Sequence, residues 1–173
     1  MSAKQLNDKD VMNILIDTAL SNGASAADCV LSRSRGLSLT RRLGKDETIE
    51  RYEDFDTGLR VFVGNKIASV STNENSEFAI KEVAKRAVDM AKIAPQDDFS
   101  LIASQETLDE FPIDNSISVD SYDEVEPNID IIRDRAKEVE DSALSVKGIT
   151  NSDGADASWG EGETLLMTSN GFF

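Results

Sequence analysis

The sequence predicts an α+β fold in which amphipathic helices pack on one face of an antiparallel sheet. Apolar residues recur at helical spacing in three separate stretches, and between residues 27 and 72 they alternate with polar residues at a period of two. The connections within that alternating region are too short for parallel crossovers, which favours an antiparallel meander. At 173 residues the chain is long enough to bury a core, and we expect residues 1–173 to form a single domain.

The three stretches with helical spacing are residues 7–22, 77–93 and 129–144. In the last of them the apolar positions advance regularly by three and four residues, which is typical of a helix with one buried face. Polar residues suited to helix capping precede the first two stretches: Asn7 or Asp8, and Asn75 or Ser76.

The alternating region predicts about five short strands. Glycine-containing sequences typical of turns separate them: Arg35-Gly36, Gly44-Lys45-Asp46, Asp56-Thr57-Gly58 and Gly64-Asn65. Two further strands are expected at residues 146–149 and 164–168, on either side of a loop at 151–162. Because an open sheet leaves edge strands, the fold invites pairing with another chain or with an extended peptide.

The composition argues against several classes of function. The chain has 33 acidic and 18 basic residues, and its net charge of −15 disfavours binding to nucleic acid or to an anionic membrane surface. It has no histidine and one cysteine, so it cannot supply a Ser-His-Asp triad, a His-ligated zinc site or an internal disulfide. No stretch approaches the length of about 18 apolar residues that spans a membrane. We therefore expect a soluble, cytoplasmic chain.

No residue emerges as a catalytic, cofactor-binding or metal-binding candidate. The segment Asn151–Asp156 superficially suggests a calcium loop, but it lacks the helix–loop–helix context and is interpreted as a turn. Cys29 lies in an apolar alternating run and is expected to be a buried thiol rather than a nucleophile. Two acidic pairs are interpreted as solvated loop charges: Asp54 with Asp56, and Asp97 with Asp98.

An ordered set of segments resembles the amino-terminal domain of the TldD/PmbA family, and within it the PmbA (TldE) branch. The segments that carry the resemblance are Gly23–Asp28, Arg35–Leu39, Arg42–Gly44, Glu50-Arg51, Gly58–Gly64, Ala68–Thr72, Ala87–Lys92, Glu140 with Ala143, Asn151–Ala155 and Ser169–Phe172. The likeness covers nearly the whole chain. It implies that these 173 residues are the amino-terminal domain of a longer protein and are interrupted at the carboxy-terminal end.

The resemblance also implies a function. The TldD branch carries a His-Glu-x-x-x-His metal motif, and the PmbA branch is its partner without that motif. Together they resemble a cytoplasmic zinc metalloprotease of peptide or unfolded substrates, which acts in proteolysis and peptide maturation and bears the older label "modulator of DNA gyrase". No catalytic residue carries over to this chain, so zinc is expected in the TldD-like partner. This domain is then expected to form part of the substrate chamber and a partner surface.

Two other interpretations stay open at this stage. The chain could be a non-enzymatic adaptor that binds peptides or proteins with the same sheet, or a fragment of a catalytically active TldD-like peptidase. Phe172 and Phe173 follow a Ser-Asn-Gly turn sequence and resemble the entry to a missing strand. We therefore expect these 173 residues to self-associate.

Overall fold

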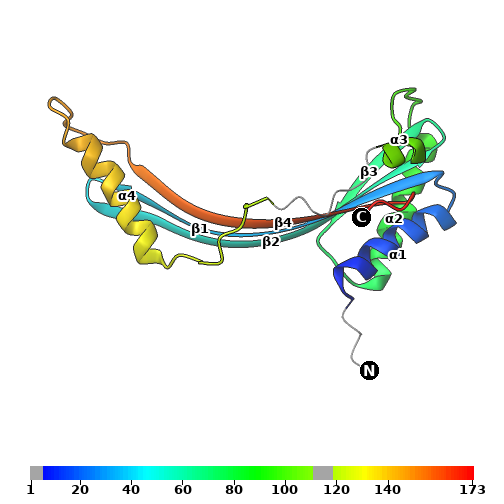
Figure 1. Ribbon diagram of the computed structural model, residues 1–173, viewed down its shortest axis with the longest axis horizontal. Coiled ribbons are helices and arrows are strands. Elements are labelled where there is room, and N and C mark those ends of the chain that lie inside the picture. Colours follow the sequence, from blue (N-terminus) through cyan, green and yellow to red (C-terminus); the bar gives the residue numbers. More distant parts are fainter. Residues whose placement is uncertain (1–5, 111–118) are drawn as a thin grey trace. The chain divides into compact units, whose positions relative to one another are not determined.

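The structure, a computed structural model, describes residues 6–110 and 119–173. Its helices are α1 (Asp8–Ser21), α2 (Glu77–Ile93), α3 (Gln105–Glu110) and α4 (Ile129–Leu144), and its strands are β1 (Ala26–Arg42), β2 (Lys45–Val63), β3 (Lys66–Thr72) and β4 (Ala155–Thr168). The four strands form one open antiparallel sheet in the order β3-β2-β1-β4 (Figure 1). The predicted α+β class is confirmed.

The three long helices lie where the sequence predicts them, because local capping and periodicity define their ends. Asn7 caps α1 by accepting the N–H of Asp10, and Ser76 caps α2 by accepting the N–H of Ala79. The capping residue of α4 is Asn128, whose side chain accepts from Ile131. The short helix α3 lies outside the three stretches in which the sequence predicts helices.

The strands are fewer and longer than the predicted runs. The turns predicted at Arg35-Gly36 and at Asp56-Thr57-Gly58 are wrong, because these residues lie inside β1 and β2. Thr57 is buried and pairs with Thr72 of β3, so the chain continues straight through this position. The turn predicted at 64–65 joins β2 to β3, whereas the turn predicted at 44–46 lies at 43–44, because Lys45 and Asp46 already belong to β2.

The carboxy-terminal region departs from the prediction in a similar way. The strand expected at residues 146–149 is wrong, because these residues form a turn after α4. Residues 155–162 of the loop expected at 151–162 are instead the beginning of β4, and the strand expected at 164–168 is the end of the same element. Gly160 and Gly162 suggested a loop, but they lie within β4 where their missing side chains admit neighbouring atoms.

The chain is organised as two compact units. Among the described residues, unit 1 comprises 6–32, 55–110 and 164–173, and unit 2 comprises 33–54 and 119–163.

In unit 1, α1 and α2 pack against each other, and their apolar faces cover the sheet. The largest fully buried side chains of this core are Met12, Leu15, Leu31, Leu59 and Ile80. Small residues of α2 such as Ala84, Ala87 and Ala91 are completely buried, which allows close approach of the helix to its neighbours.

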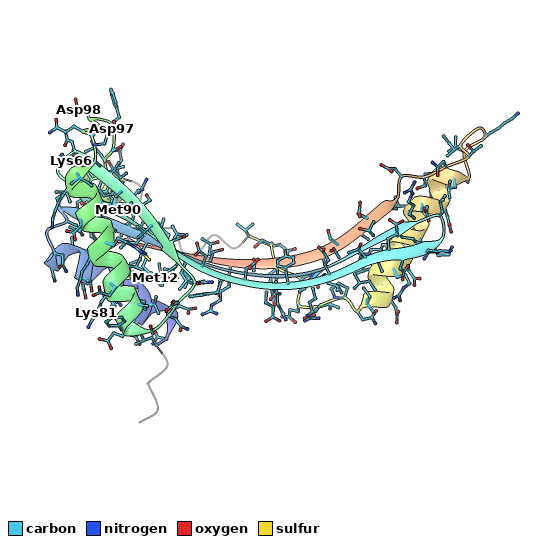
Figure 2. All side chains as sticks on the ribbon, turned by 180° about the vertical axis from the view of Figure 1, so that it is seen from behind. Met12, Lys66, Lys81, Met90, Asp97 and Asp98 are labelled. Atoms are coloured by element: carbon cyan, nitrogen blue, oxygen red, sulfur yellow. The ribbon has the colours of Figure 1, made fainter. Side chains whose placement is uncertain are left out.

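The segment after α2 is attached to β3 by polar contacts. Lys66 donates through Nζ to the carbonyl of Lys92 at 2.9 Å, and the N–H of Asp97 donates to the carbonyl of Asn65 at 2.8 Å. Figure 2 shows Lys66, Asp97 and Asp98 gathered at this end of α2. Asp98 accepts from the Asn65 side chain at 3.0 Å.

In unit 2, α4 covers one face of the sheet. Ile132 and Ala136 of α4 are completely buried against Leu37 and Leu39 of β1, with Trp159 of β4 packed at the margin. This second core is small, and polar contacts around it hold the helix to the strands.

Candidate interaction surface

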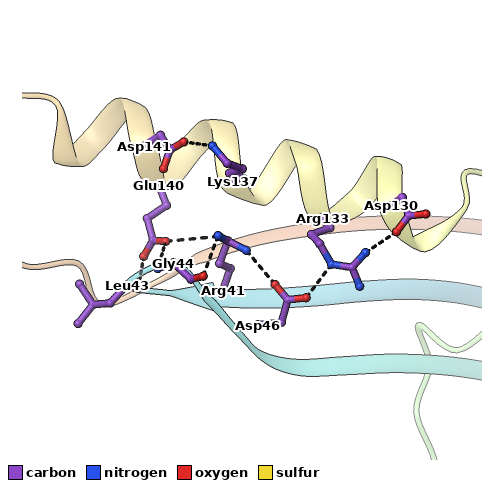
Figure 3. A network of polar contacts seen from close by, with 9 residues as sticks. All are labelled: Arg41, Leu43, Gly44, Asp46, Asp130, Arg133, Lys137, Glu140 and Asp141. Atoms are coloured by element: carbon purple, nitrogen blue, oxygen red, sulfur yellow. Dashed lines mark hydrogen bonds and ion pairs between the residues drawn. The ribbon is translucent and has the colours of Figure 1, made fainter.

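Glu140 is the most deeply buried acidic residue of unit 2, with 1% of its surface exposed. Its carboxylate accepts the backbone N–H of Leu43 at 2.6 Å and that of Gly44 at 2.9 Å (Figure 3). These two residues form the two-residue turn between β1 and β2, and both have positive φ, 46° and 79°. Leucine is rarely found in this conformation, so the carboxylate holds a turn that the sequence alone does not favour.

The two N–H donors also determine the charge state of Glu140. Hydrogen bonds from Gly44 and Leu43 lower the pKa of the Glu140 carboxyl, against the opposing effect of burial, and the Arg41 charge lowers it further. The group is therefore ionised when the protein is folded. It fastens α4 to the tip of the β1–β2 hairpin.

A chain of ion pairs extends from Glu140 along α4. Arg41 lies 3.7 Å from the Glu140 carboxylate through Nε and donates to Asp46 at 3.0 Å. Asp46 also accepts from Arg133 at 2.7 Å, and Arg133 is paired in turn with Asp130 (Figure 3). The Arg133 and Arg41 hydrogen bonds lower the pKa of Asp46. The network joins both strands of the hairpin to the helix.

A second set of charges ties the segment before α4 to the sheet. Glu126 accepts from Arg35 of β1 and from Arg51 of β2, each at 2.9 Å. Arg35 also donates to Glu161 of β4 at 2.5 Å and lies over the Trp159 ring, 5.5 Å from its centroid. The Arg35 hydrogen bond lowers the pKa of Glu161. Three strands are thereby cross-linked on the face that α4 covers.

Tyr52 lies on the opposite face of unit 2, directly over a glycine. A Cβ atom built on Gly36 would stand 2.5 Å from Cε1 of the Tyr52 ring, and one built on Gly160 would stand 3.4 Å from its hydroxyl. The ring of this β2 residue therefore crosses β1 and reaches β4. Because the side chain is 47% exposed, one side of the ring contacts the glycines and the rest faces solvent.

The outer edge of β2 in unit 2 is open. Pairing with β3 begins only at Thr57, and every residue from Lys45 to Asp54 is exposed. We call residues Lys45–Asp54 the β2 edge. Within residues 6–110 and 119–173, no other backbone segment bonds to its outer side.

The polar residues singled out in the sequence have structural roles. Cys29 is completely buried as predicted, and burial raises the pKa of its thiol to about 12, with Asp28 adding to the effect. Asp97 accepts from the N–H of Phe99 and the hydroxyl of Ser100, which is an ordinary turn arrangement. Asp54 is exposed on the β2 edge.

The segment Asn151–Asp156 also proves to be a connection. Its first residues form the turn into β4, where the N–H of Gly154 donates to Ser152, and Arg42 donates to the carbonyl of Ser152. Asp156 accepts from Thr40 at 2.5 Å, so it belongs to the sheet and not to a calcium loop. In the part of the chain that the structure describes, no three His, Cys, Asp or Glu side chains gather as metal ligands would.

The sequence did not predict the structural roles of two residues of unit 2, Glu140 and Tyr52. Glu140 is spaced four residues from Ala136 and eight from Ile132, so a charged side chain occupies the apolar stripe of α4. That conflict with the hydrophobic pattern is the signal that indicates a buried partner. Tyr52 is an isolated aromatic in a charged run, and only its position opposite Gly36 explains it.

Comparison with known proteins agrees with this description. Residues 27–91 match the family model described as PmbA/TldA metallopeptidase domain 1. The predicted resemblance to the TldD/PmbA family is confirmed. None of the helices in the described residues is long and apolar enough to cross a membrane.

Among individual proteins, the chain is similar to members of the PmbA branch. It is 26% identical over 172 residues to the metalloprotease PmbA homolog of Haemophilus influenzae, covering 99% of this chain and 37% of that protein. It is also 26% identical over 167 residues to metalloprotease PmbA of Escherichia coli O157:H7, covering 94% of this chain and 36% of the relative. The chain thus spans little more than a third of the curated relatives it matches.

Solved structures show the same fold. A putative modulator of DNA gyrase from Bacteroides thetaiotaomicron superposes with a TM-score of 0.71 at 22% identity, covering 99% of this chain and 38% of that one. TldE from Thermococcus kodakarensis superposes with a TM-score of 0.74 at 16% identity, covering 93% and 35%.

Proposed function

We propose that this chain is the amino-terminal domain of a PmbA/TldE-like subunit of a TldD/TldE-type metalloprotease, and that it is not catalytic by itself. The observation that carries the proposal is the similarity to PmbA proteins over 99% of the chain, together with the family match at residues 27–91. In this proposal the domain encloses substrate and contacts a TldD-like subunit, while peptide hydrolysis takes place in that partner.

The residues of this chain do not fit a catalytic zinc ion. The chain has no histidine, and its cysteine is buried with a pKa of about 12 and so is held as the neutral thiol rather than the thiolate that binds metal. The zinc expected in this kind of protease would therefore be held by the TldD-like subunit. No step of peptide hydrolysis is assigned to a side chain of this domain.

The arrangement of unit 2 supports a role in binding an extended polypeptide substrate. Salt bridges and the Glu140 contact hold α4 on one face of the sheet, and the β2 edge is left exposed beside that fixed layer. A rigid sheet with an open edge suits the binding of an extended polypeptide, because little conformational entropy is lost on the protein side. We propose that peptide or unfolded protein is the substrate and that the site of action is the cytoplasm.

A co-purification experiment tests the proposal. The 173-residue chain carrying an affinity tag is expressed together with the TldD-like subunit from the same genome. We expect the TldD-like subunit to co-elute, zinc to be found in the complex, and neither zinc nor peptidase activity to accompany the chain alone. Failure to co-elute at low salt, with both proteins folded, would contradict the proposal.

Co-elution and the complete reading frame distinguish the proposal from the two other interpretations of this chain. A non-enzymatic adaptor would bind peptides but would not retain a TldD-like subunit. A fragment of an active TldD-like peptidase would continue, in the complete reading frame, into a His-Glu-x-x-x-His sequence. The PmbA-like interpretation requires a continuation without that motif.

A further inference from the structure

The β2 edge carries unneutralised negative charge. It contains five acidic and two basic residues. One acid, Asp46, is paired with Arg41 and Arg133, and the base Arg51 is paired with Glu126. The remaining acids have no ion pair within the described part of the chain: Glu47, Glu50, Glu53 and Asp54. The backbone groups on the outer side of β2 are therefore surrounded by free carboxylates.

Tyr52 belongs to the same stretch of β2 and supplies an aromatic surface on one face of the sheet, inward from the edge. Gly36 and Gly160 leave room for its ring to lie across the sheet, and about half of the side chain faces solvent. Aromatic faces attract ammonium and guanidinium groups. Glu50 and Glu53 stand within two residues of Tyr52 in the sequence, so a cation that approaches the ring also approaches negative charge.

We propose that the β2 edge binds an extended, basic polypeptide segment by strand addition, with a lysine or arginine side chain placed over Tyr52. An added strand would bond to the outer backbone groups of β2, and its alternate side chains would face the side of the sheet on which Tyr52 lies. The inference rests on the proposed function and specifies its substrate class. A second copy of this chain is a poor occupant, because pairing two β2 edges brings like charges together.

The probe is a fluorescein-labelled ten-residue peptide that alternates lysine with threonine, added to the 173-residue chain while anisotropy is measured. We expect saturable binding that weakens as salt is raised. A peptide that alternates glutamate with threonine should not bind. A lysine–threonine peptide N-methylated at every residue keeps its charge but has no N–H group to donate to the edge on either side, so it should lose most of the affinity.

Variants locate the binding. Tyr52→Ala should weaken binding of the lysine–threonine peptide by about threefold to fivefold through loss of the cation–aromatic contact. The double variant Glu50→Gln/Asp54→Asn should weaken it by about the same factor. The matched control is Asp134→Asn/Glu138→Gln, which removes the same charge from exposed positions of α4 and should leave the affinity unchanged.

Amide chemical shifts of the unmodified chain give a measurement that does not depend on the folding of any variant. We expect the lysine–threonine peptide to perturb residues 46–54 more than any other segment. The proposal is overturned if the perturbations lie elsewhere, if the N-methylated peptide binds equally well, or if the α4 control loses as much affinity as the edge variant. Co-elution of the TldD-like subunit is measured separately, so a missing peptide site can be told apart from a wrong assignment of the domain.

Discussion

At the scale of single residues, two side chains of unit 2 decide local structure that their neighbours in sequence do not. Glu140 binds the N–H groups of the β1–β2 turn from a position 97 residues away from Leu43. Tyr52 occupies the space that a glycine leaves on the opposite face of the sheet. The role of each side chain can therefore be tested by one substitution and one matched control.

Glu140 should make the free energy of unfolding depend on pH. Its pKa is lowered in the folded state from an ordinary value of 4.5, so its contribution is complete above that value and is lost as the pH falls through the folded pKa. We expect Glu140→Gln to lower the melting temperature at pH 7 and to cost progressively less below about pH 4.5. The exposed neighbour in the control, Glu138→Gln, should show little effect at either pH, and an equal loss for both variants would contradict the assignment.

We expect glycine to be needed at position 36 because the Tyr52 ring occupies the space of a side chain there, and not because the backbone conformation requires glycine. Alanine at this position would place Cβ 2.5 Å from the ring, so we expect Gly36→Ala to reduce the free energy of unfolding by about 1–3 kcal/mol. Combining it with Tyr52→Ala should recover most of the loss in a denaturant-unfolding cycle. The control is Gly162→Ala, whose Cβ would meet only the Arg33 carbonyl at 3.6 Å. Additive costs for the first two substitutions would contradict this explanation.

At the scale of elements, α4 is attached to the sheet by a small apolar contact and by charges around it. Only Ile132 and Ala136 contribute completely buried apolar side chains from the helix. The exposed face of α4 carries the i,i+4 pair of Lys137 with Asp141, and a pair of this kind contributes little to stability. The apolar part of the attachment therefore depends mainly on the packing of one isoleucine, Ile132.

Truncation of that isoleucine tests this account. Ile132→Ala should reduce the free energy of unfolding by about 2–5 kcal/mol, because the side chain is completely buried between α4 and Leu37 and Leu39. The adjacent Ile131 is 41% exposed, so Ile131→Ala should cost less than about 1 kcal/mol. Denaturant unfolding at neutral pH gives both values. Similar costs at the two positions would show that the helix is not held by its buried face.

At the scale of the whole molecule, the net charge of −15 opposes association while exposed apolar side chains favour it. Phe78 and Phe99 are 78% and 95% exposed, and Phe173 is 50% exposed with Lys9 over its ring. Phe172 bonds back to Thr168, which gives the carboxy-terminal residues a turn of their own. Self-association of this chain stays a prediction.

Salt dependence separates the two effects. We expect light scattering to show little association at low salt and more at high salt, because screening removes the repulsion between acidic chains and leaves the apolar contacts. A variant ending at Thr168 should associate less than the full chain under the same conditions. A chain that is monomeric at both salt concentrations, or a truncation without effect, would rule out the expected role of the terminal phenylalanines.

The α+β class, the three long helices and the burial of Cys29 could be predicted from the amino-acid sequence. These features depend on local rules, namely capping by Asn7 and Ser76, a helical period and an alternating period, which act between residues close in the chain. The resemblance to PmbA-type first domains could also be recognised from the order of short segments along the chain, and it is confirmed.

The connections between the strands, the position of the β2 edge and the partners of the acidic residues depend on contacts between distant segments. A glycine in a sequence can indicate either a turn or a place where another group lies close to the backbone. Gly36 is of the latter kind, because the Tyr52 ring lies over it. The buried role of Glu140 depends on contacts across 97 residues that no local pattern encodes. The β2 edge is exposed because β3 is too short to pair beyond Thr57, and strand register of that kind is set by packing between distant segments.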